Sequence, residues 1–378
     1  MRFKKVLMFL VVGFLVFCPL VEEVLAASVE KYMELGAAAA KEGNFKKAAA
    51  AFRLAVKADP QSAAAYYNLG VAYQHLSMLK EAEEAYREAI RLKPEYPGSY
   101  LNLGSILNNL GRPKEAISVL EKGLAVSPKD PSFYYNLGDS WEKLGDDKKA
   151  LYNFRKVTEL APSFPDAWHR CGVILGRMKD YEKAVSCYRR ALELKPDLDS
   201  ALFNLGAALG NMGDWRSQAE VTEKFLKRQP GVALGWYNLG VARWHLGEVL
   251  EAQKAFEKAT HLSPEYPYAW NNLSQCLIKS GKYAEAEEAA GKAIDLEPGL
   301  VVAWNSLGLA RLGAKDVDGA EDAYRRALKL LPDSPDAHFG LGVVAIAKGS
   351  LQKAQEELEF LERIKSPLAS HLKHYMGL

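Results

Sequence analysis

Small residues recur along this chain every 34 residues, and this period constrains its fold more than any other feature. Glycine occupies nine of the ten points of the lattice, and Ser274 occupies the remaining one. The glycines are Gly36, Gly70, Gly104, Gly138, Gly172, Gly206, Gly240, Gly308 and Gly342. Alanine usually follows each point by twelve residues and proline by twenty-four. A repeat of this length indicates a stack of helical hairpins, none of which can bury its apolar face alone.

Each position of the repeat has a predicted role. We number the positions so that the first repeat is residues 29–62 and the tenth is residues 335–368. Positions 4, 7, 8 and 11 form one stripe of the first helix. We expect the small residue at position 8 to face the alanine at position 20, so that the two helices approach closely. Glycine at position 15 predicts a left-handed residue after the first helix, and proline at position 32 predicts the end of the second.

The repeats resemble a known family. Segments such as AYYNLGVAYQ (65–74) and GWYNLGVARW (235–244) are similar to the tetratricopeptide repeat (TPR) pattern, and the resemblance covers residues 29–368. It implies an all-α fold, a right-handed superhelical α-solenoid of helix-turn-helix repeats. It also implies a concave groove lined by the first helix of each pair. Apolar residues at helical spacing predict a C-terminal capping helix over residues 369–378.

The sixth repeat departs most from the pattern. Gln218 stands at position 20 and Thr222 at position 24, where alanine and a large apolar residue are usual. Ala219 follows one residue late, so a local shift of register in the second helix is one interpretation. The departure as a whole indicates either simple divergence of one repeat or a flexible point in the superhelix.

The N-terminus has the layout of a secretory signal. Arg2, Lys4 and Lys5 precede an apolar run from Val6 to Val21, and small residues surround a candidate cleavage point after residue 26 or 27. We therefore expect residues 1–26 to be a signal peptide, with an uncleaved membrane anchor as the alternative. Either alternative predicts an exported protein, periplasmic or extracellular.

The sequence offers no candidate for catalysis, a cofactor or a metal ion. It contains no CxxC pair, phosphate-binding loop or zinc-protease motif. Its formal net charge of +2 argues against a dedicated nucleic-acid binder. Cys171 and Cys187 fall on the two helices of the fifth repeat. Either they form a disulfide or they serve as apolar core residues, and the sequence leaves both alternatives open.

Function is expected in the groove, at positions 2, 5, 6, 9, 12 and 13 of the first helices. Position 6 carries a row of asparagines with one arginine: Asn68, Asn102, Asn136, Arg170, Asn204, Asn238 and Asn272. The row resembles the asparagine ladder of the O-linked N-acetylglucosamine transferase superhelix, which implies that it holds an extended peptide by its backbone. A carboxylate clamp like that of chaperone-binding TPR domains is incomplete, because only Asn136 and Arg170 fit it.

Apolar residues mark the groove of the last four repeats. Position 12 carries Trp244, Ile278, Leu312 and Ile346, and position 9 carries Val241, Leu309 and Val343. We expect these side chains to be free of core packing and to contact a partner.

These features predict an exported, non-enzymatic scaffold that holds an extended or helical segment of another protein, in an envelope or secretory assembly. The alternative is a targeting or regulatory subunit of a glycan-modifying or polysaccharide-export complex. A homodimer is possible, nucleic acid is not an expected partner, and the membrane is contacted only through an uncleaved N-terminal segment.

Overall fold

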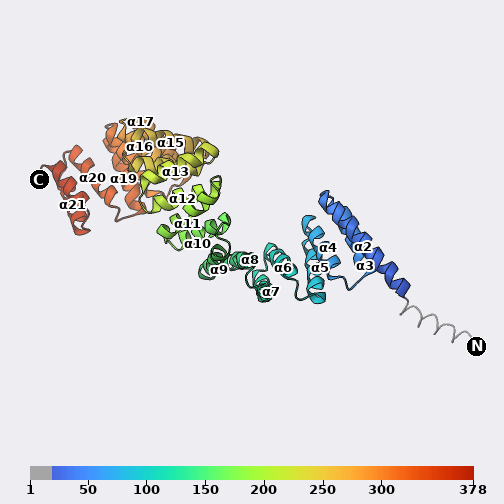
Figure 1. The fold of residues 1–378 in the computed structure, drawn as a ribbon. Helices are drawn as coiled ribbons and strands as arrows, with labels where there is room; N and C mark the ends of the chain where they lie inside the picture. Colours follow the sequence, from blue (N-terminus) through green and yellow to red (C-terminus); the bar gives the residue numbers. More distant parts are fainter. Residues whose placement is uncertain (1–18) are drawn as a thin grey trace, which may run out of the picture. The chain divides into compact units, whose positions relative to one another are not determined.

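The computed structural model describes residues 19–378, and every regular element in this range is a helix (Figure 1). The predicted all-α repeat architecture is therefore confirmed. The helices group into two compact units, one ending at Lys179 and one beginning at Asp180. Residues 1–18, which hold most of the predicted signal segment, lie outside the described part. None of the described helices is both long enough and apolar enough to cross a membrane.

In the unit that ends at Lys179, four hairpins and one further helix follow the repeats. The helices are α2 (Pro19–Lys41), α3 (Phe45–Ala58), α4 (Ala63–His75), α5 (Leu79–Leu92), α6 (Pro97–Asn109), α7 (Pro113–Val126), α8 (Pro131–Lys143), α9 (Asp147–Leu160) and α10 (Pro165–Arg177). Each helix from α2 to α9 packs on the next one in the chain.

The unit that begins at Asp180 continues the same order. Its helices are α11 (Tyr181–Leu194), α12 (Asp199–Asn211), α13 (Trp215–Arg228), α14 (Ala233–His245), α15 (Val249–Leu262), α16 (Pro267–Lys279), α17 (Tyr283–Leu296), α18 (Val301–Gly313), α19 (Val317–Leu330), α20 (Pro335–Ala347), α21 (Leu351–Arg363) and α22 (Leu368–Met376). The last helix packs against α20 and α21, and Leu372 is fully buried there.

Local sequence sets the helix boundaries. An Asn or Asp at position 16 caps several second helices, as where the Asp146 carboxylate accepts a hydrogen bond from the Lys149 amide. The residue before the position-32 proline adopts an extended conformation, with φ of −134° at Asp59 and −139° at Lys93. This is the conformation that a following proline favours, so the helix ends there.

The lattice glycine makes room for the large side chain at position 24, which is an aromatic ring in several repeats. A Cβ atom on Gly240 would lie 2.6 Å from the Phe256 ring, and one on Gly308 would lie 2.7 Å from the Tyr324 ring. Both rings stand at position 24. Glycine is required because the ring occupies the volume that any side chain would need. Positions 8 and 20 nevertheless lie close together as expected in the eighth repeat, where the Ser274 hydroxyl donates to the Ala286 carbonyl at 2.8 Å.

Position 15 is left-handed throughout the described repeats. Seven repeats carry glycine there with φ between 72° and 77°, which confirms the prediction from the sequence. The three exceptions, Ser77, Lys179 and Lys315, adopt φ of 59°, 62° and 67°. A side chain with a Cβ atom pays about 1 kcal/mol for this conformation.

Replacing Lys315 by glycine is expected to raise the free energy of unfolding by about 0.5 kcal/mol, because relief of the left-handed strain exceeds the added entropy of the unfolded chain. The neighbouring Ala314 has φ of −77° and provides the control. Ala314→Gly should destabilise instead. Chemical denaturation measures both, and a loss of stability in Lys315→Gly would contradict the argument.

Position 4 connects several repeats to the preceding one. The indole N–H of Trp236 donates to the Pro230 carbonyl at 2.8 Å, and that of Trp270 donates to the Pro264 carbonyl at 2.7 Å. His338 makes the equivalent contact with the Pro332 carbonyl at 3.0 Å. The aromatic residue at position 4 thus satisfies a carbonyl in the turn where the previous hairpin ends.

The sixth repeat keeps its register. Helix α13 begins and ends 34 residues before α15, and Gln218 and Thr222 are buried at the usual positions. The alternative of a register shift is therefore wrong. Gly210 on α12 makes room for the amide of Gln218, since a Cβ atom there would lie 2.6 Å from its Nε2. The Oε1 atom of Gln218 is buried and has no hydrogen-bond partner among the described residues.

Candidate functional site

A groove of about 500 Å³ runs along the first helices of repeats seven to ten, in the unit that begins at Asp180. Helix α14 contributes Trp244, and α22 contributes Leu368 and Tyr375. The residues from α16, α18 and α20 all stand at the positions predicted to face a groove. They are Gln275, Ile278, Lys279, Val302, Asn305, Ser306, Leu309, Leu312, Asp336, Phe339, Gly340 and Val343.

The apolar residues predicted at position 12 have two roles. Trp244, Ile278 and Leu312 line the groove, as expected. However, all three are half-buried and pack against the core clusters of their repeats. The expectation that they are free of core packing is therefore wrong. Ile346 is half-buried against the cluster that contains Leu372, so the last helix covers it.

Several lining residues were not predicted individually. Val302 stands at position 2, Phe339 at position 5, and Tyr375 lies on the last helix. Val302 is 45% exposed and Tyr375 is 60% exposed, so both offer apolar surface to a ligand. In the sequence, each could have been recognised as an apolar residue at a position whose side chain is not needed for core packing. Together with Leu309, which is 48% exposed, they make this the apolar part of the groove.

Few polar groups interrupt the apolar lining. Gln275 lines the groove with a side-chain amide that can both donate to and accept from a ligand, whereas the Oδ1 atom of Asn305 is buried and has no partner within the described part of the chain. Lys279 and Asp336 bring one charge of each sign. Tyr324 contributes a phenol whose pKa is raised by burial, so it remains protonated.

Some members of the asparagine row donate hydrogen bonds to tyrosine hydroxyls within the fold. Asn102 donates to the hydroxyls of Tyr67 at 3.3 Å and Tyr86 at 3.2 Å. Asn272 donates to the Tyr237 hydroxyl at 3.4 Å. In each case the asparagine at position 6 contacts the tyrosine at position 5 of the preceding repeat. These two amides therefore have partners within the fold, and holding a peptide is not their only role.

The hydrogen bonding of the other asparagines depends on the residue at position 5 of the preceding repeat. This residue is not a tyrosine before Asn68, Asn136 or Asn238. Asn136 donates to the Ser132 carbonyl of its own helix at 2.8 Å. Asn68 and Asn238 are half-buried and make no side-chain hydrogen bond to the described residues. Asn204 is half-buried in α12. Asn68 and Asn238 are thus the best candidates for holding a ligand backbone.

Arg170 belongs to an ion-pair network. Its guanidinium lies 2.9 Å from Asp139 and 2.5 Å from Glu142, and it stacks on the Phe154 ring. Arg177 contacts Glu142 as well, at 2.8 Å. Because the charge of Arg170 is already matched, a carboxylate ligand gains little from it. This further weakens the carboxylate-clamp interpretation.

The described residues hold no arrangement of three or more metal-binding side chains. Cys276 is buried, and burial raises the pKa of its thiol to about 12, which keeps it protonated. Cys171 is buried and Cys187 half-buried, and a bond between them stays an open prediction.

Comparison with known proteins identifies the repeats. Residues 157–365 match the family model described as the Cilia and flagella-associated protein 70 C-terminal domain. Four tetratricopeptide repeat models match residues 36–77, 63–96, 97–140 and 131–164. The comparison with curated proteins gives no match.

Solved structures share the fold. The C-terminal part of a TPR repeat-containing protein from Cytophaga hutchinsonii is 19% identical, covers 64% of this chain and 99% of that chain, and has a TM-score of 0.53. The pilF protein of Pseudomonas aeruginosa is 22% identical, covers 55% and 95%, and has a TM-score of 0.49. YrrB, described as a TPR protein with an unusual peptide-binding site, is 26% identical, covers 47% and 96%, and has a TM-score of 0.42.

The family models cover the chain without a gap from residue 36 to residue 365, and one of them alone spans more than half of it. This extent agrees with the repeats of the structure, whose helical hairpins carry the 34-residue period. The chain belongs to the tetratricopeptide repeat family, with the Cilia and flagella-associated protein 70 C-terminal domain as its longest match.

Proposed function

We propose that the protein is an exported scaffold that holds an extended or helical segment of a partner protein in the groove of repeats seven to ten. It serves an envelope or secretory assembly and carries out no catalysis. The export of the chain is supported by the basic residues and apolar run at its N-terminus.

One observation carries the proposal: large apolar side chains gather in one groove and remain exposed there. Val302, Leu309 and Tyr375 are each between 45% and 60% exposed. Covering an apolar side chain of this size is worth about 1.5–3 kcal/mol, so a partner with a complementary apolar face gains affinity in the groove. Scattered exposed apolar residues are common, but a cluster in a concave surface favours binding.

The polar groups of the groove favour a polypeptide as the occupant. The side-chain amide of Gln275 suits the N–H and C=O groups that every peptide backbone offers. Lys279 and Asp336 can pair with side chains of opposite charge and so orient the segment.

The substitution Leu309→Glu tests the groove. Leu309 is exposed and the change adds a charge to the apolar lining, so it is expected to weaken the partner at least about tenfold without loss of stability. Affinity capture with quantitative mass spectrometry measures the recovered proteins, and light scattering measures self-association.

Leu250 provides the matched control. It is 65% exposed on α15 and does not line the groove. Leu250→Glu should recover the same proteins as the wild type. Identical recovery by Leu309→Glu and by the wild type, with no change in self-association, would contradict the proposed groove.

A further inference from the structure

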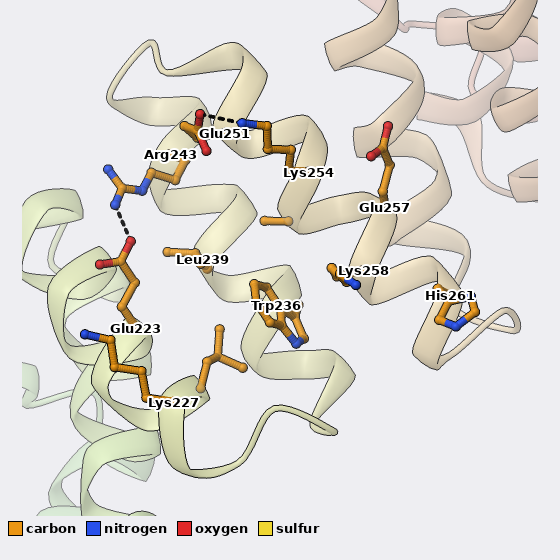
Figure 2. Close-up of a pocket in the computed structure, with 12 residues that line it drawn as sticks. Glu223, Lys227, Trp236, Leu239, Arg243, Glu251, Lys254, Glu257, Lys258 and His261 are labelled. Carbon is orange, nitrogen blue, oxygen red and sulfur yellow. Dashed lines mark hydrogen bonds and ion pairs between the residues drawn. The ribbon is translucent and has the colours of Figure 1, made fainter.

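A second concavity, distinct from the groove, lies within the unit that begins at Asp180. It has a volume of about 780 Å³ and is formed by α13, α14 and α15 (Figure 2). We refer to it as the basic crevice. It shares α14 with the groove but no lining residue. The two concavities can therefore be altered independently.

The floor of the basic crevice is apolar. Leu226, Trp236, Leu239 and Ala255 form it, and Figure 2 shows Trp236 between the residues of α13 and those of α15. Because the Trp236 indole N–H is already donated to the Pro230 carbonyl, the ring presents carbon surface to a ligand. The floor can thus receive one apolar or aromatic side chain.

The acidic residues of the rim are all engaged. Glu223 pairs with Arg243, and Glu251 pairs with Lys254 at 2.9 Å. Glu257 accepts a hydrogen bond from the Gln253 amide at 2.7 Å. The paired cations offset the charges of Glu223 and Glu251, whereas the neutral Gln253 amide leaves the charge of Glu257 in place. The two unpaired lysines of the rim still outnumber it.

Three basic side chains of the rim are not engaged. Lys227, Lys258 and His261 make no hydrogen bond or ion pair with the residues that the structure describes. In Figure 2, Lys227 projects from α13, whereas Lys258 and His261 project from α15, with Trp236 between Lys227 and Lys258. A ligand that reaches the floor thus has unpaired cations within reach on both sides.

The equivalent surfaces of other repeats show that the charge of such a crevice varies along the chain. In the first two repeats, a crevice of about 380 Å³ is lined by residues at the same repeat positions. Its rim carries Glu84 and Glu88, where the basic crevice carries Lys254 and Lys258. On α18 and α19, the equivalent crevice of about 480 Å³ is basic again, with Arg325, Arg326 and Lys329 in its lining. The shape therefore follows from the repeat, whereas the charge follows from the local sequence, and the basic crevice has the largest volume of the three.

We infer that the basic crevice binds an acidic peptide segment that carries one apolar or aromatic side chain among its carboxylates. The apolar side chain covers the floor at Trp236, and the carboxylates meet Lys227 and Lys258. Nucleic acid fits less well, because Lys227 and Lys258 are the unpaired lysines beside the floor among the described residues, whereas a phosphate backbone is held through contacts to many phosphates. The inference does not depend on the groove of repeats seven to ten.

Selection from a random dodecapeptide phage library against the full-length chain tests the inference. The selected peptides should be rich in Asp and Glu around one apolar residue. Binding of such a synthetic peptide, followed by fluorescence polarisation, should weaken at least about tenfold in a Lys227→Glu/Lys258→Glu variant. Both lysines are exposed, so the variant should keep the circular dichroism and melting curve of the wild type.

Matched controls separate this result from general electrostatic attraction. Arg53→Glu/Lys57→Glu makes the same change of charge in the crevice of the first two repeats and should leave the affinity unchanged. Leu309→Glu should also bind normally, which distinguishes this site from the groove. A selection without acidic bias, an equal loss in the Arg53/Lys57 control, or displacement by single-stranded DNA at equal concentration would overturn the inference.

Discussion

Replacing Gly308 by alanine is expected to lower the local free energy of unfolding by about 3 kcal/mol, at the upper end for an overpacked core. The new Cβ atom would lie 2.7 Å from the Tyr324 ring. That ring cannot move away, because it packs against the backbone of Gly340 as well, where a Cβ atom would also clash with it. Tyr324 is also only 3% exposed, so the added methyl group would have to displace packed protein atoms rather than water.

Gly291 provides the opposite case. It lies inside α17, and a Cβ atom there would meet nothing within 4 Å. Gly291→Ala should therefore raise the free energy of unfolding by about 1 kcal/mol through helix propensity alone. Hydrogen exchange at the amides of α17, α18 and α19 measures both variants. A loss smaller than about 1 kcal/mol in Gly308→Ala would show that the ring does relax.

The sequence alone was sufficient to predict the features of the structure that recur from repeat to repeat. Helix boundaries, the left-handed residue at position 15 and the groove-facing positions all depend on the residue type at one position and on its neighbours along the helix. Such features repeat with the period, so ten copies support each prediction. This is why the residues of α16, α18 and α20 that line the groove stand only at predicted positions.

The remaining features depend on pairs of residues from different helices. Asn102 reaches a tyrosine 35 residues earlier, while Asn68, with no tyrosine at that preceding position, makes no such bond within the described residues. The row of asparagines looks uniform, but its availability to a ligand is set by the preceding repeat. Similarly, Trp244 is half-buried because it packs against the neighbouring hairpin, and the sequence pattern of a single helix does not reveal that contact. The basic crevice was not predicted, because it forms only where side chains from three helices come together.

Exchanging Gln218 for alanine should reverse the effect of adding a methyl group at Gly210. In the wild type, Gly210→Ala places a Cβ atom 2.6 Å from Nε2 and 2.8 Å from Cδ of Gln218, which should cost about 1–3 kcal/mol. Gln218→Ala alone should be nearly neutral, since it removes packed atoms but also a buried oxygen that lacks a partner among the described residues.

The double variant Gly210→Ala/Gln218→Ala should be more stable than either single variant, because the two methyl groups share the space that the glutamine amide occupied. The coupling free energy is expected to be about 1–3 kcal/mol. Hydrogen exchange of α12 and α13 measures each corner of the cycle. Pairing Gly210→Ala with Gln253→Ala provides the control, because Gln253 is a similarly buried amide on α15 and the two effects should simply add. Additive effects at Gly210 and Gln218 would mean that the glutamine does not fill the space above the glycine. The sixth repeat would then have departed from its pattern without the compensating change on α12.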